Sequence, residues 1–201
     1  MQASGRSPHD FDAMYVGTPP WDIGRPQPAF LELAHAGELH GRVLDVGCGT
    51  GEHALMAAGL GLDATGVDTS PRAIDMAKAK AAERGLSVRF LIWDALQLSG
   101  LGEHFDTLLD SGLYHVFDDT ARARYVESLK SVTRPGSRYF LLCFSDRQPG
   151  EVGPRRVTQD EIRASFGDGW RVDSIVPKSM QVTIDPHGAQ AWLAAITRTA
   201  A

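Results

Sequence analysis

A glycine-rich loop constrains the fold of this chain more than any other feature. The loop spans residues 45–53, with the sequence DVGCGTGEH, and it follows a short apolar run at 43–44. A stretch compatible with a helix, 54–58, comes next. A strand that turns through glycines into a helix lets backbone N–H groups approach a ligand where side chains would block it. The sequence therefore predicts a ligand-binding turn between a strand and a helix of an α/β fold.

The spacing of the glycines indicates which ligand is bound. A dinucleotide fold would present G-x-G-x-x-G, with a free helix N-terminus for the pyrophosphate. Here the glycines fall as G-x-G-x-G, and Glu52 stands where a pyrophosphate would need positive potential. Acidic residues at both ends of the loop, Asp45 and Glu52, suit a cofactor with a cationic amino-acid portion. S-adenosylmethionine (SAM), which carries a sulfonium and an ammonium group, meets that description, and a dehydrogenase is disfavoured.

The loop resembles the first motif of class I SAM-dependent methyltransferases, Asp/Glu-x-Gly-x-Gly-x-Gly. Its four defining positions are Asp45, Gly47, Gly49 and Gly51. The resemblance covers nearly the whole chain. It implies a Rossmann-like α/β fold, with a mostly parallel seven-stranded sheet, helices on both faces and an antiparallel last strand. A glycine turn that serves packing alone is the alternative, which the order of the later motifs disfavours.

Strand and helix patterns alternate along the chain, as a mostly parallel, doubly wound sheet requires. We expect strands at 43–46, 64–67, 88–93, 105–109, 138–144, 170–176 and 189–197, although the last segment also fits a helix. Helices are expected at 9–16, 28–39, 51–60, 71–84, from 118 to about 133, and 158–166. The length of 201 residues suits one domain, with 1–40 forming an N-terminal lid segment and helix and 41–201 forming the core.

Four of the predicted strands are followed by aspartate at or near their ends. These residues are Asp45, Asp68, Asp94 and Asp110. Ligands of doubly wound sheets lie beyond the carboxyl ends of the strands. Crowded carboxylates repel one another, so their clustering at one edge indicates a use.

The resemblance assigns roles to residues at this edge. It implies that Asp68 accepts hydrogen bonds from both ribose hydroxyls of SAM. Asp94 accepts from the adenine amino group, and the Ala95 N–H pairs with a ring nitrogen. Asp45 orients the loop or the ammonium group, and Trp93 or Thr69 packs on the adenine. The remaining expected cofactor contacts are Trp21, Arg25, Gly47, Cys48, Gly49, Thr69, Asp110 and Ser111. Helix capping is the alternative role of Asp68 and Asp94, and for Asp110 the backbone carbonyl could matter more than the carboxylate.

The loop after the fourth predicted strand, 110–117, is expected to face the methyl acceptor. Its sequence, DSGLYHVF, lacks the Asn/Asp-Pro-Pro-Tyr/Phe motif of enzymes that methylate bases. His115 is the candidate general base, because the unperturbed histidine pKa lies near neutrality; a purely structural histidine is the alternative. We predict acceptor contacts from Tyr15, Tyr114, His115 and Arg147, of which Arg147 can hold an acidic or phenolate acceptor.

The segment 21–26, WDIGRP, resembles the covering segment of thiopurine and other thiol methyltransferases, and of small bacterial relatives that act on toxic heterocycles. In those proteins a tryptophan packs near the methionine end of the cofactor, and the resemblance gives this place to Trp21. An aromatic face also favours a cationic sulfonium. A tryptophan that only anchors the loop is the alternative.

These features together predict methyl transfer to a thiol or hydroxyl of a small aromatic or heterocyclic molecule. Sulfur is slightly favoured, since thiolates are good nucleophiles and need no strong base. Methylation of tRNA or protein, and a non-catalytic SAM-binding protein, are the alternatives. The net charge of −5 and the pI of about 5.8 disfavour a general nucleic-acid binder.

Composition also limits the surroundings of the protein. Cys48 and Cys143 lack the spacing of a metal site or a disulfide framework, so no metal is expected. The N-terminus lacks the apolar core of a signal peptide, and no apolar run is long enough to cross a bilayer. We expect a cytoplasmic monomer or homodimer that binds neither nucleic acid nor membrane.

Overall fold

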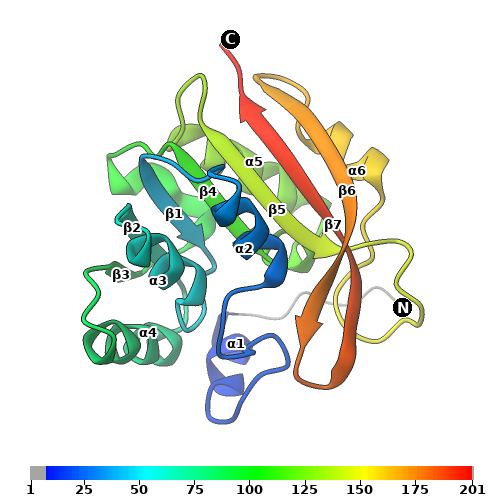
Figure 1. Cartoon of the computed structure of the whole chain (residues 1–201). Coiled ribbons are helices and arrows are strands. Elements are labelled where there is room, and N and C mark those ends of the chain that lie inside the picture. Colours follow the sequence, from blue (N-terminus) through cyan, green and yellow to red (C-terminus); the bar gives the residue numbers. More distant parts are fainter. Residues whose placement is uncertain (1–7, 201) are drawn as a thin grey trace.

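A computed structural model describes residues 8–200 and contains one seven-stranded sheet (Figure 1). The strand order is β3-β2-β1-β4-β5-β7-β6. The strands are β1 (Arg42–Val46), β2 (Asp63–Asp68), β3 (Arg89–Ile92), β4 (Thr107–Ser111), β5 (Arg138–Phe144), β6 (Trp170–Val182) and β7 (Asp185–Arg198). The first five pair in parallel, whereas β7 runs antiparallel to both β5 and β6. The predicted fold class is confirmed.

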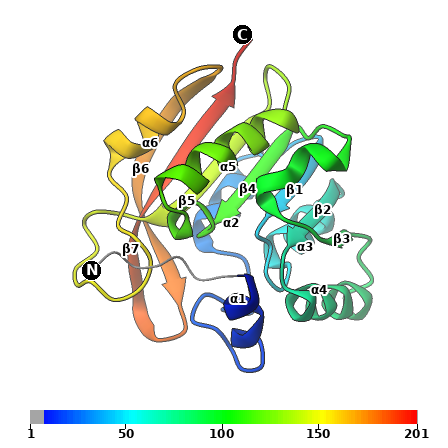
Figure 2. The ribbon, with the colours of Figure 1, turned by 180° about the vertical axis from the view of Figure 1, so that it is seen from behind.

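Helices cover both faces of the sheet. They are α1 (Pro8–Met14), α2 (Pro28–His35), α3 (Glu52–Gly59), α4 (Pro71–Glu83), α5 (Asp119–Ser131) and α6 (Gln159–Ser165), with short 3-10 helices η1 (Ala95–Leu101) and η2 (Tyr114–Val116). One apolar cluster joins α2, α3 and α4 to one face, and the other joins α5 and α6 to the opposite face. Figure 1 shows the first layer in front, and Figure 2 shows the second.

The chain reverses its winding direction at β1, which places a binding edge at its carboxyl end. β1 has β2 on one side and β4 on the other. In open α/β sheets, ligands bind outside the carboxyl ends of the strands at such a switch point. The glycine loop follows β1 directly, so the topology positions it at this edge.

Local signals predicted the helix starts well. Ser70 caps α4 by accepting from the Ala73 N–H, and Thr158 and Glu161 form the predicted capping box of α6. The ends were less well predicted, because α2 ends at His35 rather than near residue 39 and β4 extends to Ser111.

Residues 189–197, whose sequence fits either a strand or a helix, form part of the strand β7. It lies between β5 and β6, so residues on both of its faces are buried, which removes the alternation typical of a half-exposed strand. β6 is also longer than predicted. Its hairpin with β7 continues to the pair Val182↔Asp185, well beyond Phe144↔Ala191, the last pair of β5 and β7. This hairpin extends toward the N-terminal segment around α1 (Figure 1).

Candidate cofactor and acceptor site

The glycine loop has a backbone that only glycine adopts without strain. Gly47, Gly49 and Gly51 have φ angles of +69°, +52° and +85°. A Cβ on Gly51 would lie 2.6 Å from the Phe90 ring, and one on Gly49 would lie 2.8 Å from the Tyr15 hydroxyl. Both the conformation and the close packing therefore require the glycines.

Asp68 at the end of β2 holds this loop in place. Its carboxylate accepts from the Gly49 N–H at 2.9 Å and from the Ser70 N–H at 2.9 Å. Burial raises the pKa of Asp68, which these backbone hydrogen bonds partly oppose. Each oxygen keeps a further lone pair, so the carboxylate can also accept from a ligand hydroxyl.

Asp45 is buried beneath the loop and faces α3. Its Oδ2 accepts from the Ala54 N–H at 3.1 Å, and its Oδ1 lies 3.9 Å from His53 Nδ1. Burial raises the pKa of Asp45 to about 8. This geometry supports the predicted orienting of the loop. Cys48, also buried, packs toward Gly66 of β2.

Glu52 does not face the cofactor edge, which corrects one argument from the sequence. Its carboxylate forms ion pairs with Lys80 of α4 and with Arg84, the residue that caps α4, each at 2.8 Å. Although Glu52 is buried, these pairs lower its pKa, and their positive charges balance the charge of the carboxylate. The acidity of the loop is therefore no indication of its ligand. The inference that the loop binds SAM depends instead on the glycine spacing and on Asp68.

Asp94 caps η1, which is the role predicted from the sequence as the alternative to adenine binding. It accepts from the Leu96 N–H at 2.9 Å and from the Gln97 side chain at 3.1 Å. The Trp93 indole donates to the Gln97 carbonyl and packs beside Gly100, so it lies along η1. The roles of Trp93 or Thr69, and of Asp94 and Ala95, toward adenine remain predictions.

The carboxylate of Asp110 is an internal anchor, so a cofactor contact of this residue, which stays a prediction, would come from its backbone carbonyl. It is fully buried and accepts from the Tyr125 hydroxyl at 2.8 Å and the Tyr139 hydroxyl at 2.7 Å. It also accepts from the backbone N–H groups of Leu113 and Tyr114. Burial raises its pKa to about 6. The next residue, Ser111, is half-buried at the end of β4, and its predicted cofactor contact remains open.

Tyr114 is also part of the core rather than the acceptor wall. Its side chain is fully buried, its ring stacks near Phe166, and its hydroxyl shares a 2.7 Å hydrogen bond with Ser165. These contacts direct the side chain toward α6 and the core, which contradicts the predicted substrate contact of Tyr114.

His115 has a geometry that contradicts a general base. Its Nδ1 accepts from the Phe144 N–H at 3.0 Å, which puts the ring proton on Nε2. Burial lowers the pKa of His115 to about 3. A group with this pKa takes up a proton poorly near neutrality. The neutral ring packs edge-on to Phe144 and lies near Gly112. Because Nδ1 already accepts a hydrogen bond, the ring can donate from Nε2 but cannot accept a proton there.

Part of the N-terminal segment lies against the glycine loop, and its role as a lid stays a prediction. The Trp21 indole donates to the Tyr15 hydroxyl at 2.9 Å, and the Tyr15 hydroxyl lies against Gly49. Thr50 donates to Asp22 at 3.0 Å, which ties the lid to the loop. Burial and the negative charge of Asp68 strongly raise the pKa of Tyr15, so its hydroxyl stays protonated.

Arg25 and Arg147, two further predicted site residues, are both exposed at the surface. Arg25 is exposed and donates to the Gln181 side chain at 2.8 Å, so it binds the β6–β7 hairpin. Its predicted cofactor contact has no support in this geometry. Arg147 follows β5 and stacks over Trp192, with its guanidinium 4.6 Å from the ring centroid. It is exposed at the carboxyl edge and remains a candidate acceptor contact.

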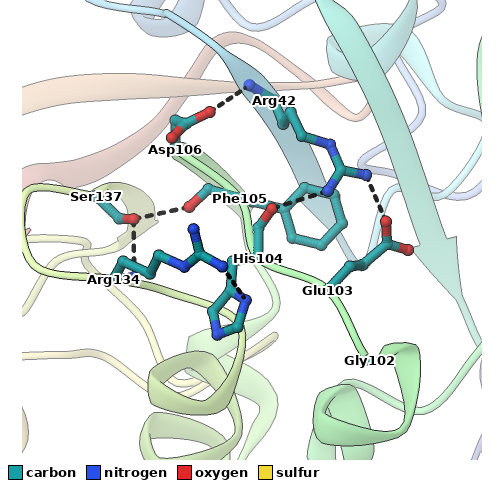
Figure 3. A pocket seen from close by; sticks show the side chains of 8 residues that line it. All are labelled: Arg42, Gly102, Glu103, His104, Phe105, Asp106, Arg134 and Ser137. Carbon is teal, nitrogen blue, oxygen red and sulfur yellow. Dashed lines mark hydrogen bonds and ion pairs between the residues drawn. The ribbon is translucent and has the colours of Figure 1, made fainter.

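A cavity of about 410 Å³ lies at the opposite, amino-terminal edge of the sheet (Figure 3). Its lining residues are Arg42, Gly102, Glu103, His104, Phe105, Asp106, Arg134 and Ser137, none of which was predicted to form the site. Most polar groups there bond to one another, as the pairs of Arg42 with Glu103 and Arg134 with His104 show. This cavity is separate from the cofactor edge.

Sequence reasoning missed Gln27 and His53, two buried polar residues that join the lid to α3. The Gln27 N–H donates to His53 Nε2 at 3.1 Å. His53 was quoted as part of the glycine loop but was given no role, and Gln27 carried no motif. Their partners are distant in sequence, so only the fold reveals them.

Comparison with known proteins identifies the family. A model of a methyltransferase domain matches residues 43–136. A 2-heptyl-1-hydroxyquinolin-4(1H)-one methyltransferase of Mycobacteroides abscessus is 39% identical over 170 residues, which are 83% of this chain and 75% of that protein. This chain belongs to the methyltransferase family. A probable thiol methyltransferase of Arabidopsis thaliana is 26% identical over 176 residues, with the same coverage of both chains.

Solved structures agree with this assignment. One, described as conversion of a disulfide bond into a thioacetal group during echinomycin biosynthesis, has a TM-score of 0.88 and 40% identity, covering 96% of this chain and 93% of the other. Magnesium protoporphyrin IX methyltransferase of Synechocystis, solved with bound SAM, shares the fold at a TM-score of 0.65 and 23% identity, covering 84% and 76%. The protein is a SAM-dependent methyltransferase. No helix within residues 8–200 is long and apolar enough to span a membrane.

Proposed function

We propose that this methyltransferase acts on a small aromatic or heterocyclic molecule through a sulfur or oxygen atom that is already ionised near neutral pH. The relatives named for a hydroxyquinolinone and for thiols support the substrate class. The observation that carries the proposal is the hydrogen bond from the Phe144 N–H to His115 Nδ1. With its pKa lowered to about 3, His115 is no base for a protonated acceptor.

Thiols, phenols with electron-withdrawing rings and N-hydroxy heterocycles are acidic enough to ionise without a general base from the enzyme. Their anions need only alignment opposite the sulfonium leaving group, which proximity and orientation supply. Arg147 at the carboxyl edge is the cation we assign to the acceptor anion, with Tyr15 as a neutral neighbour. Sulfur remains slightly favoured over oxygen because thiolates are the stronger nucleophiles.

For the cofactor, we propose that Asp68 accepts from the ribose hydroxyls and that Asp94 and Ala95 recognise adenine. Gly47 and Gly49 would let the loop backbone approach the adenosine and methionine portions. Trp21 and Tyr15 would cover the methionine end, since Trp21 donates to the Tyr15 hydroxyl and that hydroxyl lies against Gly49. The carboxyl edge of the sheet is the place where a doubly wound fold binds such a ligand.

A panel of acceptors tests this proposal. We expect formation of S-adenosylhomocysteine from SAM with aromatic thiols, acidic phenols and N-hydroxyquinolones, and at least about 10-fold less with alkyl alcohols, whose protons need a base. The assay is chromatographic detection of S-adenosylhomocysteine at pH 7.5, with acceptor-free reactions as controls. Equal rates for alkyl alcohols and thiols would refute the proposal, and turnover only on tRNA or protein would favour a macromolecular substrate.

A further inference from the structure

Gln27 is a buried polar side chain that fixes the lid to the β6–β7 hairpin. It is 2% exposed and immediately precedes α2. Its Oε1 accepts from the Gln181 N–H at 2.8 Å, and its Nε2 donates to the Gln181 carbonyl at 2.9 Å. The amide thus pairs with both backbone groups of one strand residue, much as a neighbouring strand would. The Thr183 N–H donates to the Pro20 carbonyl at 2.8 Å, which attaches the lid to the hairpin at a second point.

The backbone of the same residue is attached to the glycine loop. The Gln27 N–H donates to His53 Nε2 at 3.1 Å. His53 lies in the first turn of α3, and its Nδ1 faces the carboxylate of Asp45 at 3.9 Å. Its ring packs edge-on against Phe30 of α2, with 4.7 Å between the ring centroids. Hydrogen bonds therefore link His53 of α3 to Gln27 and Gln27 to β6, with the Asp45 carboxylate close to the far side of the His53 ring.

The hairpin reaches the acceptor side of the site. It continues past the end of β5, and the Met180 methyl group lies 3.6 Å from where a Cβ on Gly112 would stand. Gly112 belongs to the loop after β4, which follows the anchor Asp110. Movement of the hairpin would therefore change the acceptor wall as well as the lid.

We propose that Gln27 is a positioning residue that couples SAM binding at the glycine loop to the β6–β7 hairpin. A cofactor at the glycine loop would contact the lid at Tyr15, whose hydroxyl lies against Gly49 and accepts from Trp21, and the lid holds the hairpin through Gln27. Coupling between two sites is a free energy shared by both. Because this coupling is reciprocal, SAM binding stabilises the acceptor wall and an acceptor bound there strengthens SAM binding.

Hydrogen exchange of single backbone amides, followed by NMR, tests this coupling with SAM alone as the probe. Saturating SAM is expected to slow exchange of the residue 181 amide at least about 5-fold in the wild-type protein, the lower end of typical coupling between sites. In Gln27→Ala, which keeps the backbone bond to His53, SAM is expected to slow exchange at Gly49 but not at residue 181.

The matched control is Gln181→Ala. Gln27 pairs with the backbone of residue 181, so this variant keeps both bonds and loses only the contact with Arg25. We expect SAM to slow the residue 181 amide in this variant as in wild type. Slowing that persists in Gln27→Ala, or its absence in the wild-type protein, would overturn the proposal. The wild-type measurement decides it alone should Gln27→Ala fail to fold.

Discussion

Asp68→Ala is expected to raise the dissociation constant for SAM at least about 10-fold. The substitution removes the carboxylate that we assign to the ribose hydroxyls, and hydrogen bonds to a charged group are about twice as strong as neutral ones. It also removes the acceptor of the Gly49 N–H, so the loop loses an anchor. Isothermal titration with SAM and with S-adenosylhomocysteine measures the effect.

An altered ligand separates the loss of the ribose contact from the loss of the Gly49 anchor. S-adenosylhomocysteine and its 2′,3′-dideoxy analogue are titrated into wild type and Asp68→Ala. Removal of the hydroxyls should weaken binding to wild type and have little effect on the variant, because the two changes delete the same contact. Unchanged affinity in Asp68→Ala, or an equal penalty for the analogue in both proteins, would refute this assignment.

Asp110→Ala should cost about 3–5 kcal/mol of unfolding free energy, because it leaves several buried donors without a partner. The donors are the hydroxyls of Tyr125 and Tyr139 and the N–H groups of Leu113 and Tyr114. For a protein of this size, the loss corresponds to a decrease in Tm of roughly 10 °C. Thermal and urea unfolding measure it.

Tyr125→Phe provides the matched comparison for Asp110. It removes one donor and leaves the carboxylate with three, so the expected cost is about 1 kcal/mol. A loss below about 1 kcal/mol for Asp110→Ala would show that the carboxylate does not anchor the loop. Because that loop carries Gly112 of the proposed acceptor wall, the variant should also lose methyl transfer if it folds.

Local features of the sequence predicted the framework of the site. The glycine loop, the aspartates at strand ends and the capping pattern of Thr158 and Glu161 each depend on residues close in sequence. Their geometry follows from short-range backbone chemistry. The fold class was therefore predictable, and cofactor binding at the carboxyl edge of the sheet stays a prediction.

Side-chain roles were predictable only where the partners are local. Asp110 looked like its three counterparts, but the tyrosines that occupy its carboxylate come from α5 and β5. Glu52 looked free, although its partners Lys80 and Arg84 lie a helix away. The character of β7 depends on its central place in the sheet, which no window of sequence contains. In each case long-range packing decided the outcome.

The pH dependence of kcat/KM tests the central claim, that the acceptor arrives ionised and no histidine serves as base. The profiles of two acceptors with different pKa values are compared, for example an aromatic thiol and a less acidic phenol. We predict that each rate rises with the acceptor's own ionisation and levels off above it, because the neutral His115 ring supplies no proton acceptor. A single limb near pH 6.5 that is common to both acceptors and lost in His115→Gln would contradict the account.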